Sequence, residues 1–128
     1  MSNWETYEFE DRIKAILRDL QYGENELDHF GQPFVSSYQI AIAYAERHPE
    51  AFQALNLPIG GLGTGEHNSL AQYIARELSR RIKKHEIIDI EPAWFRRDYV
   101  NQIDFNCQNE IITASNLSAL SMFRLRED

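Results

Sequence analysis

The chain has 128 residues and a net charge of −7, with 43% apolar residues and one cysteine. This length suits a single domain, and the ordinary apolar content argues against disorder and against a fibrous repeat. The acidic amino terminus lacks the pattern of a signal peptide and no uncharged run would span a bilayer, so we expect a cytoplasmic protein with no membrane segment.

The first predicted helix runs from Trp4 to about Gln21. Ser2 with Glu5 fits a capping box at its start, and Gly23 stands where a helix would stop. Residues 6–10 also alternate, so the first turn could instead be extended. Apolar residues recur at helical spacing along the rest of the segment: Ile13, Ile16, Leu17 and Leu20.

The central helix is predicted over residues 37–48. Ser36 and Gln39 form another capping-box pattern, and the segment has almost no polar side, which is typical of a helix covered by its neighbours. Pro49 cannot continue this helix but suits the first position of a new one, so a short helix should follow over residues 49–55, after a bend near His48.

The most clearly amphipathic helix is predicted over residues 69–84, and we call it the basic helix because it carries five Lys and Arg residues against one Glu. Ser69 with Gln72 predicts its capped start. Arg81 falls at the edge of the apolar arc, so its stem should pack while its head reaches a carboxylate. The apolar arc holds Leu70, Ala71, Ile74, Ala75, Leu78 and Ile82, and the opposite arc holds Tyr73, Arg76, Arg80, Lys83 and Lys84.

The carboxy-terminal third reads as β structure. Residues 87–90 predict a short strand that ends before Pro92, and residues 103–114 predict a hairpin that turns near Gln108 and Asn109. Residues 118–125 could supply one further strand. The pattern at residues 92–101 does not distinguish a helical turn from an irregular aromatic segment. The fold class is therefore α+β, with about four helices in the first two thirds packed with a small antiparallel hairpin or sheet; a winged-helix-like fold is the alternative.

A glycine-rich loop, residues 60–65, precedes the basic helix. Glycines expose backbone N–H groups and a helix amino terminus attracts anions, so Gly61, Gly63, Thr64, Gly65 and His67 form a candidate ligand or anion loop. Glu66 and His67 stand where a Walker loop needs Lys and Ser or Thr, which disfavours nucleotide hydrolysis. The simpler interpretation is a loop whose glycines adopt positive φ or allow close packing.

No motif for catalysis or metal binding stands out. The sequence lacks HExxH and CxxC, and His67 and His85 would lie roughly 27 Å apart along one helix. Cys107 alternates in phase with apolar residues, so a small buried side chain is expected there instead of a reactive thiolate. We therefore expect no metal, no cofactor and no catalytic residue, and an enzyme is disfavoured.

The preferred function is a non-catalytic interaction module that binds a partner through Tyr73, Arg76, Arg80, Lys83 and Lys84 of the basic helix. An acidic protein surface is favoured over nucleic acid because the whole chain is acidic. The same cations could instead merely pair with the acidic amino-terminal helix. A homo-oligomer is possible but not indicated.

Two other functions are compatible with the sequence. A winged-helix DNA binder fits the order of helices and hairpin, but the connector at residues 57–68 is long for a helix-turn-helix, and no Lys or Arg lies between Asn101 and Ala114. The second is a small enzyme or ligand binder that uses the glycine loop.

Overall fold

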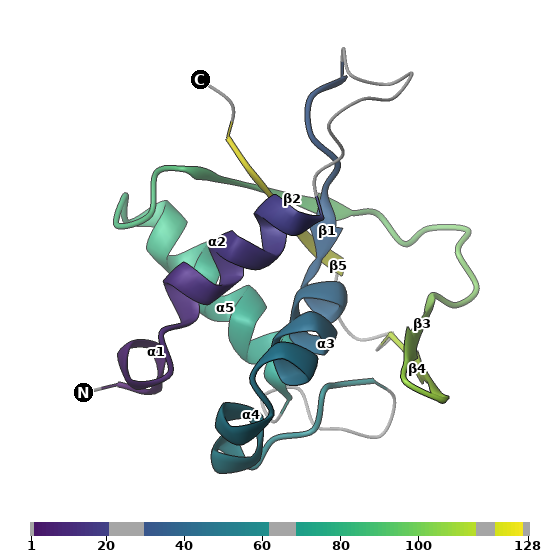
Figure 1. Cartoon of the computed structure of the whole chain (residues 1–128). Coiled ribbons are helices and arrows are strands. Elements are labelled where there is room, and N and C mark those ends of the chain that lie inside the picture. The colour runs from purple at the N-terminus through teal and green to yellow at the C-terminus, as the bar shows by residue number, and fades with distance from the viewer. Residues whose placement is uncertain (1, 21–29, 62–68, 115–119, 127–128) are drawn as a thin grey trace.

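The computed structural model describes residues 2–20, 30–61, 69–114 and 120–126. Helices fill its amino-terminal part and antiparallel strands its carboxy-terminal third (Figure 1), which confirms the predicted α+β class. A two-residue strand among the helices is the exception. The elements are α1 (Asn3–Thr6), α2 (Phe9–Asp19), β1 (Val35–Ser36), α3 (Ser37–Arg47), α4 (Pro49–Leu55), α5 (Leu70–Lys83), β2 (Ile90–Phe95), β3 (Asp104–Cys107), β4 (Glu110–Thr113) and β5 (Leu120–Leu125).

The sequence predicts one continuous first helix. This prediction is wrong, because the chain breaks between α1 and α2. Glu8 adopts the left-handed conformation, with φ of 53°. The capped start is confirmed, since the Ser2 hydroxyl accepts a hydrogen bond from the N–H of Glu5 at 3.3 Å. The break lets Trp4 and Phe9 both turn inward, where their rings stack 5.3 Å apart. The predicted stop at Gly23 lies outside the described residues.

Local signals set the next two helices as predicted. Both hydrogen bonds of the capping box form at α3: the Gln39 N–H donates to Ser36 Oγ at 3.1 Å, and the Ser36 N–H donates to Gln39 Oε1 at 2.8 Å. Pro49 is the first residue of α4, and His48 bends the chain between the two helices with φ of −131° and ψ of 63°.

Three strands form one antiparallel sheet in the order β1-β5-β2, so β5 is the central strand. The strand predicted over residues 87–90 is displaced: β2 begins at Ile90 and continues through Pro92 to Phe95. Proline is tolerated there because β2 is an edge strand, where a missing N–H removes no bond from the ladder. The sequence does not reveal β1, since two residues are too few to show a period.

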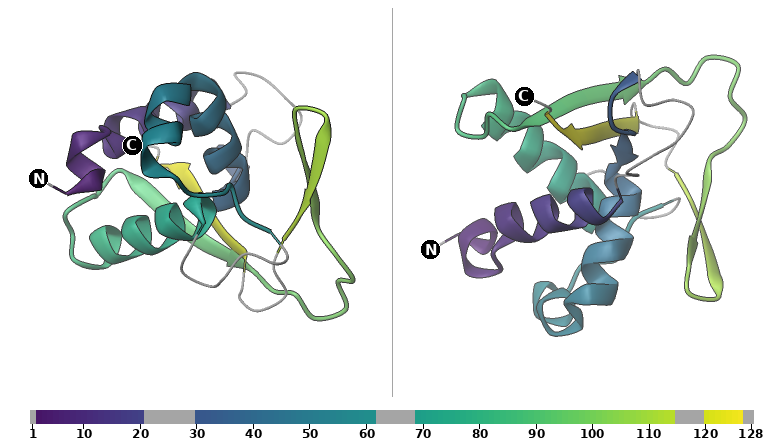
Figure 2. Two further views of the ribbon diagram at one scale, coloured as in Figure 1. Left: turned by 90° about the horizontal axis from the view of Figure 1, so that it is seen from below. Right: turned by 45° about the horizontal axis from the view of Figure 1, so that its top comes forward.

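The hairpin β3–β4 is confirmed, with its turn at Gln108 and Asn109 and a φ of 57° at Gln108. It forms a separate two-stranded sheet and lies to one side of the helices (Figure 2). Its contact with α3 includes the rings of Tyr38 and Phe105, which stack 5.1 Å apart. Cys107 is half-buried on this hairpin, so the expected full burial is wrong, because one face of a hairpin beside the body is only partly covered.

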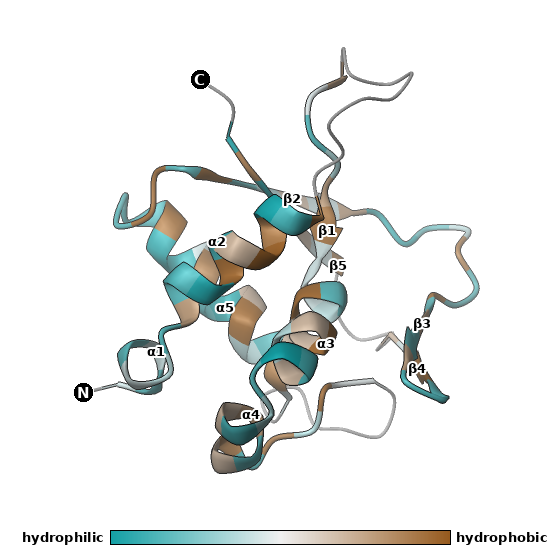
Figure 3. Cartoon of the chain, in the orientation of Figure 1, coloured by the Kyte–Doolittle hydropathy of each residue, from teal (hydrophilic) through white to brown (hydrophobic). Residues whose placement is uncertain are grey.

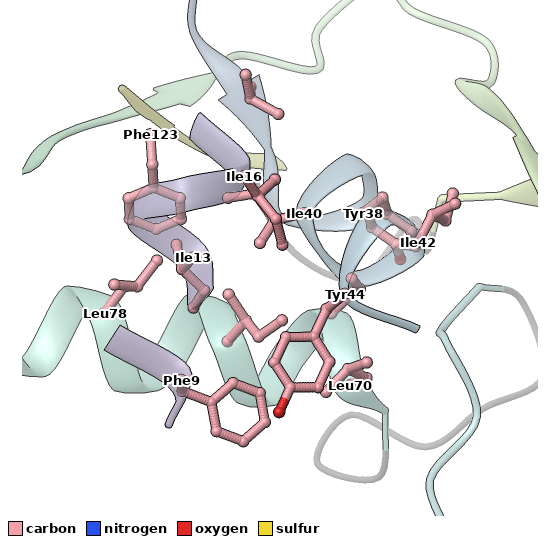
Figure 4. Close-up of a cluster of buried hydrophobic side chains, with 14 of the residues drawn as sticks. Phe9, Ile13, Ile16, Tyr38, Ile40, Ile42, Tyr44, Leu70, Leu78 and Phe123 are labelled. Atoms are coloured by element: carbon pink, nitrogen blue, oxygen red, sulfur yellow. The ribbon is translucent and has the colours of Figure 1, made fainter. Parts of the chain in front are cut away.

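The buried side chains of the described residues form one cluster, to which α2, α3 and α5 contribute their apolar faces (Figures 3 and 4). The sheet adds Val35, Ile90 and Phe123. The predicted central role of α3 is confirmed, since most of its circumference is covered. The members of the buried cluster that have no exposed surface include Phe9, Ile13, Ile16, Ile40, Tyr44, Leu70, Ile74, Leu78 and Phe123.

Candidate functional site

The basic helix of the sequence is α5, and its start and buried face form as predicted. Ser69 caps it, because its hydroxyl accepts a hydrogen bond from the Gln72 N–H at 3.2 Å. The reciprocal half of the capping box is missing: Gln72 Oε1 is buried and finds no hydrogen-bond partner in the part of the chain that the structure describes. The face that packs into the core holds Leu70, Ala71, Ile74 and Leu78.

The opposite face of α5 is exposed and carries Arg76, Arg80, Lys83 and, at the carboxy-terminal cap, Lys84. Arg80 pairs with Glu77 of the same helix at 2.7 Å. The other three form no ion pair with any residue that the structure describes. We call these four cations the exposed cations of α5.

The amino-terminal acids do not neutralise this face. Glu8 pairs with Arg12 at 3.1 Å, and Glu10 pairs with Lys14 at 2.8 Å, in both cases along α2. Pairing between the exposed cations of α5 and the acidic amino-terminal helix, which the sequence allows, is therefore not found among residues 2–20. Among the described residues, Arg76, Lys83 and Lys84 are therefore left without a carboxylate partner.

Tyr73 lies at the margin of the exposed face. It is half-buried, and its ring contacts those of Trp4 and Phe9 at centroid distances of 6.4 and 5.3 Å. The Arg76 guanidinium lies over the outer side of the same ring, with Cζ 5.7 Å from the centroid. Burial raises the pKa of Tyr73. Tyr73 thus holds Arg76 in place and offers a partner only part of its own ring.

Arg81 is placed as the sequence predicts, at the boundary between core and solvent. Its guanidinium lies 4.7 Å above the Trp4 ring and reaches Glu77 at 3.3 Å. Burial would raise the pKa of Glu77, but the hydrogen bonds and charges of Arg80 and Arg81 outweigh it, so this pKa is lowered. Glu77 therefore stays ionised and orients two arginines of α5.

The first two residues of the glycine loop have structural roles. Gly60 and Gly61 have φ of 147° and 113°, and a Cβ on Gly61 would lie 3.1 Å from the Thr113 carbonyl oxygen. The N–H groups of Leu70 and Ala71 donate to the carbonyl oxygens of Pro58 and Ile59, at 2.8 and 2.9 Å. The Gln72 N–H is bonded to Ser69, so three N–H groups in the first turn of α5 are already occupied. Fewer free N–H groups therefore remain for binding an anion.

The remaining candidates of the anion loop, Gly63, Thr64, Gly65 and His67, lie outside the described residues, so that site stays a prediction. In the described part of the chain, no three His, Cys, Asp or Glu side chains gather where they could hold a metal ion. No described helix is both long enough and apolar enough to cross a membrane.

Two features escaped the sequence analysis. The end of β2 and the segment after it expose three aromatic rings, Trp94, Phe95 and Tyr99. Arg96 of the same segment is also exposed and pairs with Asp98 at 3.1 Å. The second is a pocket beside α2 that contains Arg12, Arg47 and His48. No local pattern signals that pocket, because its members come from separate helices.

Comparison with protein-family models, with curated proteins and with solved structures finds no match to this chain.

Proposed function

We propose that the protein binds duplex DNA through the exposed cations of α5. The observation that supports this most directly is that Arg76, Lys83 and Lys84 lack a carboxylate partner among the described residues, while Arg80 is paired only within its own helix. Guanidinium and ammonium groups on one helix face suit successive phosphates of a nucleic-acid backbone.

The order of elements adds a fold-level analogy. The short strand β1 lies between α2 and α3, α5 comes directly before β2, and the sheet order is β1-β5-β2. Winged-helix domains have this arrangement, and in helix-turn-helix proteins the second helix of the motif enters the major groove. The analogy is imperfect, because α4 separates α3 from α5. The fold analogy favours DNA binding, but the proposed function depends on the exposed cations of α5.

An acidic protein surface is the second candidate partner, and the sequence ranks it first. The net charge of −7 favours it, since the summed field of an acidic protein opposes the approach of a polyanion such as DNA. The hairpin β3–β4 also lacks Lys and Arg. The same four cations would then pair with carboxylates of the partner.

Fluorescence anisotropy of a labelled DNA duplex, measured over a range of salt concentrations, distinguishes between the two candidate partners. If α5 binds phosphates, the log–log slope should be about −0.9 per neutralised phosphate, and the triple variant Arg76→Ala, Arg80→Ala, Lys83→Ala should flatten it by about two to three. Arg18→Ala, which removes an exposed cation from α2, is the matched control and should leave the slope nearly unchanged.

Weak duplex binding even at low salt would overturn the DNA proposal. Salt-sensitive binding of an acidic protein that the triple variant loses, and Arg18→Ala keeps, would then support the second candidate.

A further inference from the structure

An open pocket of about 450 Å³ lies between α2 and the junction of α3 with α4. Its volume falls within the range of small-molecule sites, roughly 300–1,000 Å³. None of its lining residues belongs to α5, so it is separate from the proposed DNA-binding face. The lining residues are Tyr7, Arg12, Arg47, His48, Pro49, Glu50 and Ala51.

Three nitrogen-bearing side chains converge on this pocket from different elements. Arg12 comes from α2, Arg47 from the last turn of α3, and His48 from the bend before α4. The buried Tyr44 supports two of them: Arg12 Nη1 lies 3.4 Å from its hydroxyl oxygen, and the His48 ring lies 5.1 Å from its ring. These two groups are therefore held by the core and do not swing freely in solvent.

Among the described residues, each arginine pairs with one carboxylate, and neither of these carboxylates lines the pocket. Arg12 Nη2 pairs with Glu8 at 3.1 Å, and Arg47 Nη1 pairs with Asp19 at 2.8 Å. The side chains of Glu8 and Asp19 are 63% and 64% exposed, so these are surface ion pairs, which contribute little to stability. An oxyanion inside the pocket could share or replace these partners at small cost.

We propose that this pocket binds a small molecule through an oxyanion of the phosphate class, with Arg12 and Arg47 as its cationic ligands and the His48 ring as a third hydrogen-bonding ligand. A guanidinium offers paired donors that match the oxygens of such a group. Glu50 lines the same pocket and opposes the anion. Pro49 and Ala51 give the wall an apolar part that suits an organic substituent. This inference does not depend on DNA binding.

The protonation of His48 provides a readout at the site itself. Burial lowers the pKa of His48, the charges of Arg12 and Arg47 lower it further, and Glu8 acts in the opposite direction. A bound anion would offset the charges of the two arginines, so this pKa should rise. Sulfate is a suitable probe, because its charge does not change over the titration range of histidine.

The experiment is an NMR titration of His48 in sulfate and in chloride at equal ionic strength. We expect the pKa of His48 to be higher in sulfate than in chloride. Arg47→Gln should weaken sulfate binding roughly tenfold, as expected for the loss of one charged hydrogen-bond donor. Glu50→Gln should tighten it, and Arg18→Gln, a cation of α2 outside the pocket, is the matched control.

An unchanged pKa of His48, or a rise of equal size in Arg47→Gln and in the control, would overturn the proposal. The opposite responses of Arg47→Gln and Glu50→Gln distinguish a binding site from a loss of fold, which would lower affinity in both. Comparing inorganic phosphate with phenyl phosphate then identifies the source of the oxyanion: tighter binding of the ester indicates an organic ligand, and equal or weaker binding indicates the free anion.

Discussion

The hydroxyl of Tyr44 donates a hydrogen bond to the backbone carbonyl of Tyr7, with an oxygen-to-oxygen distance of 2.8 Å. That carbonyl lies at the break between α1 and α2, where the helical ladder of hydrogen bonds is interrupted. A side chain of α3 therefore satisfies a backbone group that the break leaves open, and it also contacts Arg12. The bend that brings Trp4 and Phe9 together depends on this contact.

Tyr44→Phe should lower the free energy of unfolding by about 0.5–1.5 kcal/mol, because it removes the part-buried hydrogen bond from the Tyr44 hydroxyl to the Tyr7 carbonyl. Urea denaturation measures the change. Tyr99→Phe is the matched control, since the Tyr99 side chain is fully exposed and its hydroxyl should contribute almost nothing. Equal midpoints for the two variants would mean that water replaces the lost bond.

Ile42→Ala should cost about 2–5 kcal/mol, through lost burial and an unfilled cavity. Ile42 is only 8% exposed, in the middle of α3. Ile88→Ala removes the same atoms from a side chain that is 72% exposed, and it should change the urea midpoint little. Equal urea midpoints for Ile42→Ala and Ile88→Ala would contradict the prediction.

Glu77 should stabilise the fold at neutral pH and lose this contribution in acid. Its pKa is lower in the folded chain than in the unfolded one, so protonation at low pH favours the unfolded state. The difference in stability between the wild type and Glu77→Gln should therefore be full above the unfolded pKa and shrink as the pH falls through the folded one. Denaturation series at several pH values test this, and a difference that grows in acid would contradict it.

Cys107 should react slowly with thiol reagents although it is only half-buried. Burial raises its pKa, and the nearby charges of Glu46 and Glu110 raise it further, which depletes the thiolate near neutral pH. Glu46→Gln removes one negative charge and should speed labelling of the native protein. No acceleration would indicate that access to the sulfur limits the rate, whatever its ionisation.

Sequence reasoning succeeded where the signal lies within a few residues of its effect. The capping pair at Ser36 and Gln39, the helix start at Pro49 and the turn at Gln108 are all local, and each forms as predicted. The periodicity of α5 also identified its buried face and its exposed cations, because a single helix fixes both. Tyr73, which the periodicity places on the exposed arc, is instead half-buried against Trp4 and Phe9.

The errors arise where distant segments decide the local structure. The left-handed Glu8 is favoured by packing of aromatic rings and by Tyr44, neither of which is visible in the residues around it. Pro92 belongs to a strand only because that strand lies at the edge of the sheet. Likewise, the pocket with Arg12 and Arg47 forms where two helices meet, so no spacing in the sequence predicts it.

The central position of β5 has a consequence for how the protein is made. β1 and β2 are both synthesised before β5, and in the part of the sheet that the structure describes each of them pairs with β5 alone. The helices can form beforehand, whereas the edge of β2 that pairs with β5 lacks its hydrogen-bond partners until residues 120–125 are available. Pairing Val35 with Phe123 also joins the parts of this sheet that are most distant in sequence, so it carries the larger cost in loop-closure entropy.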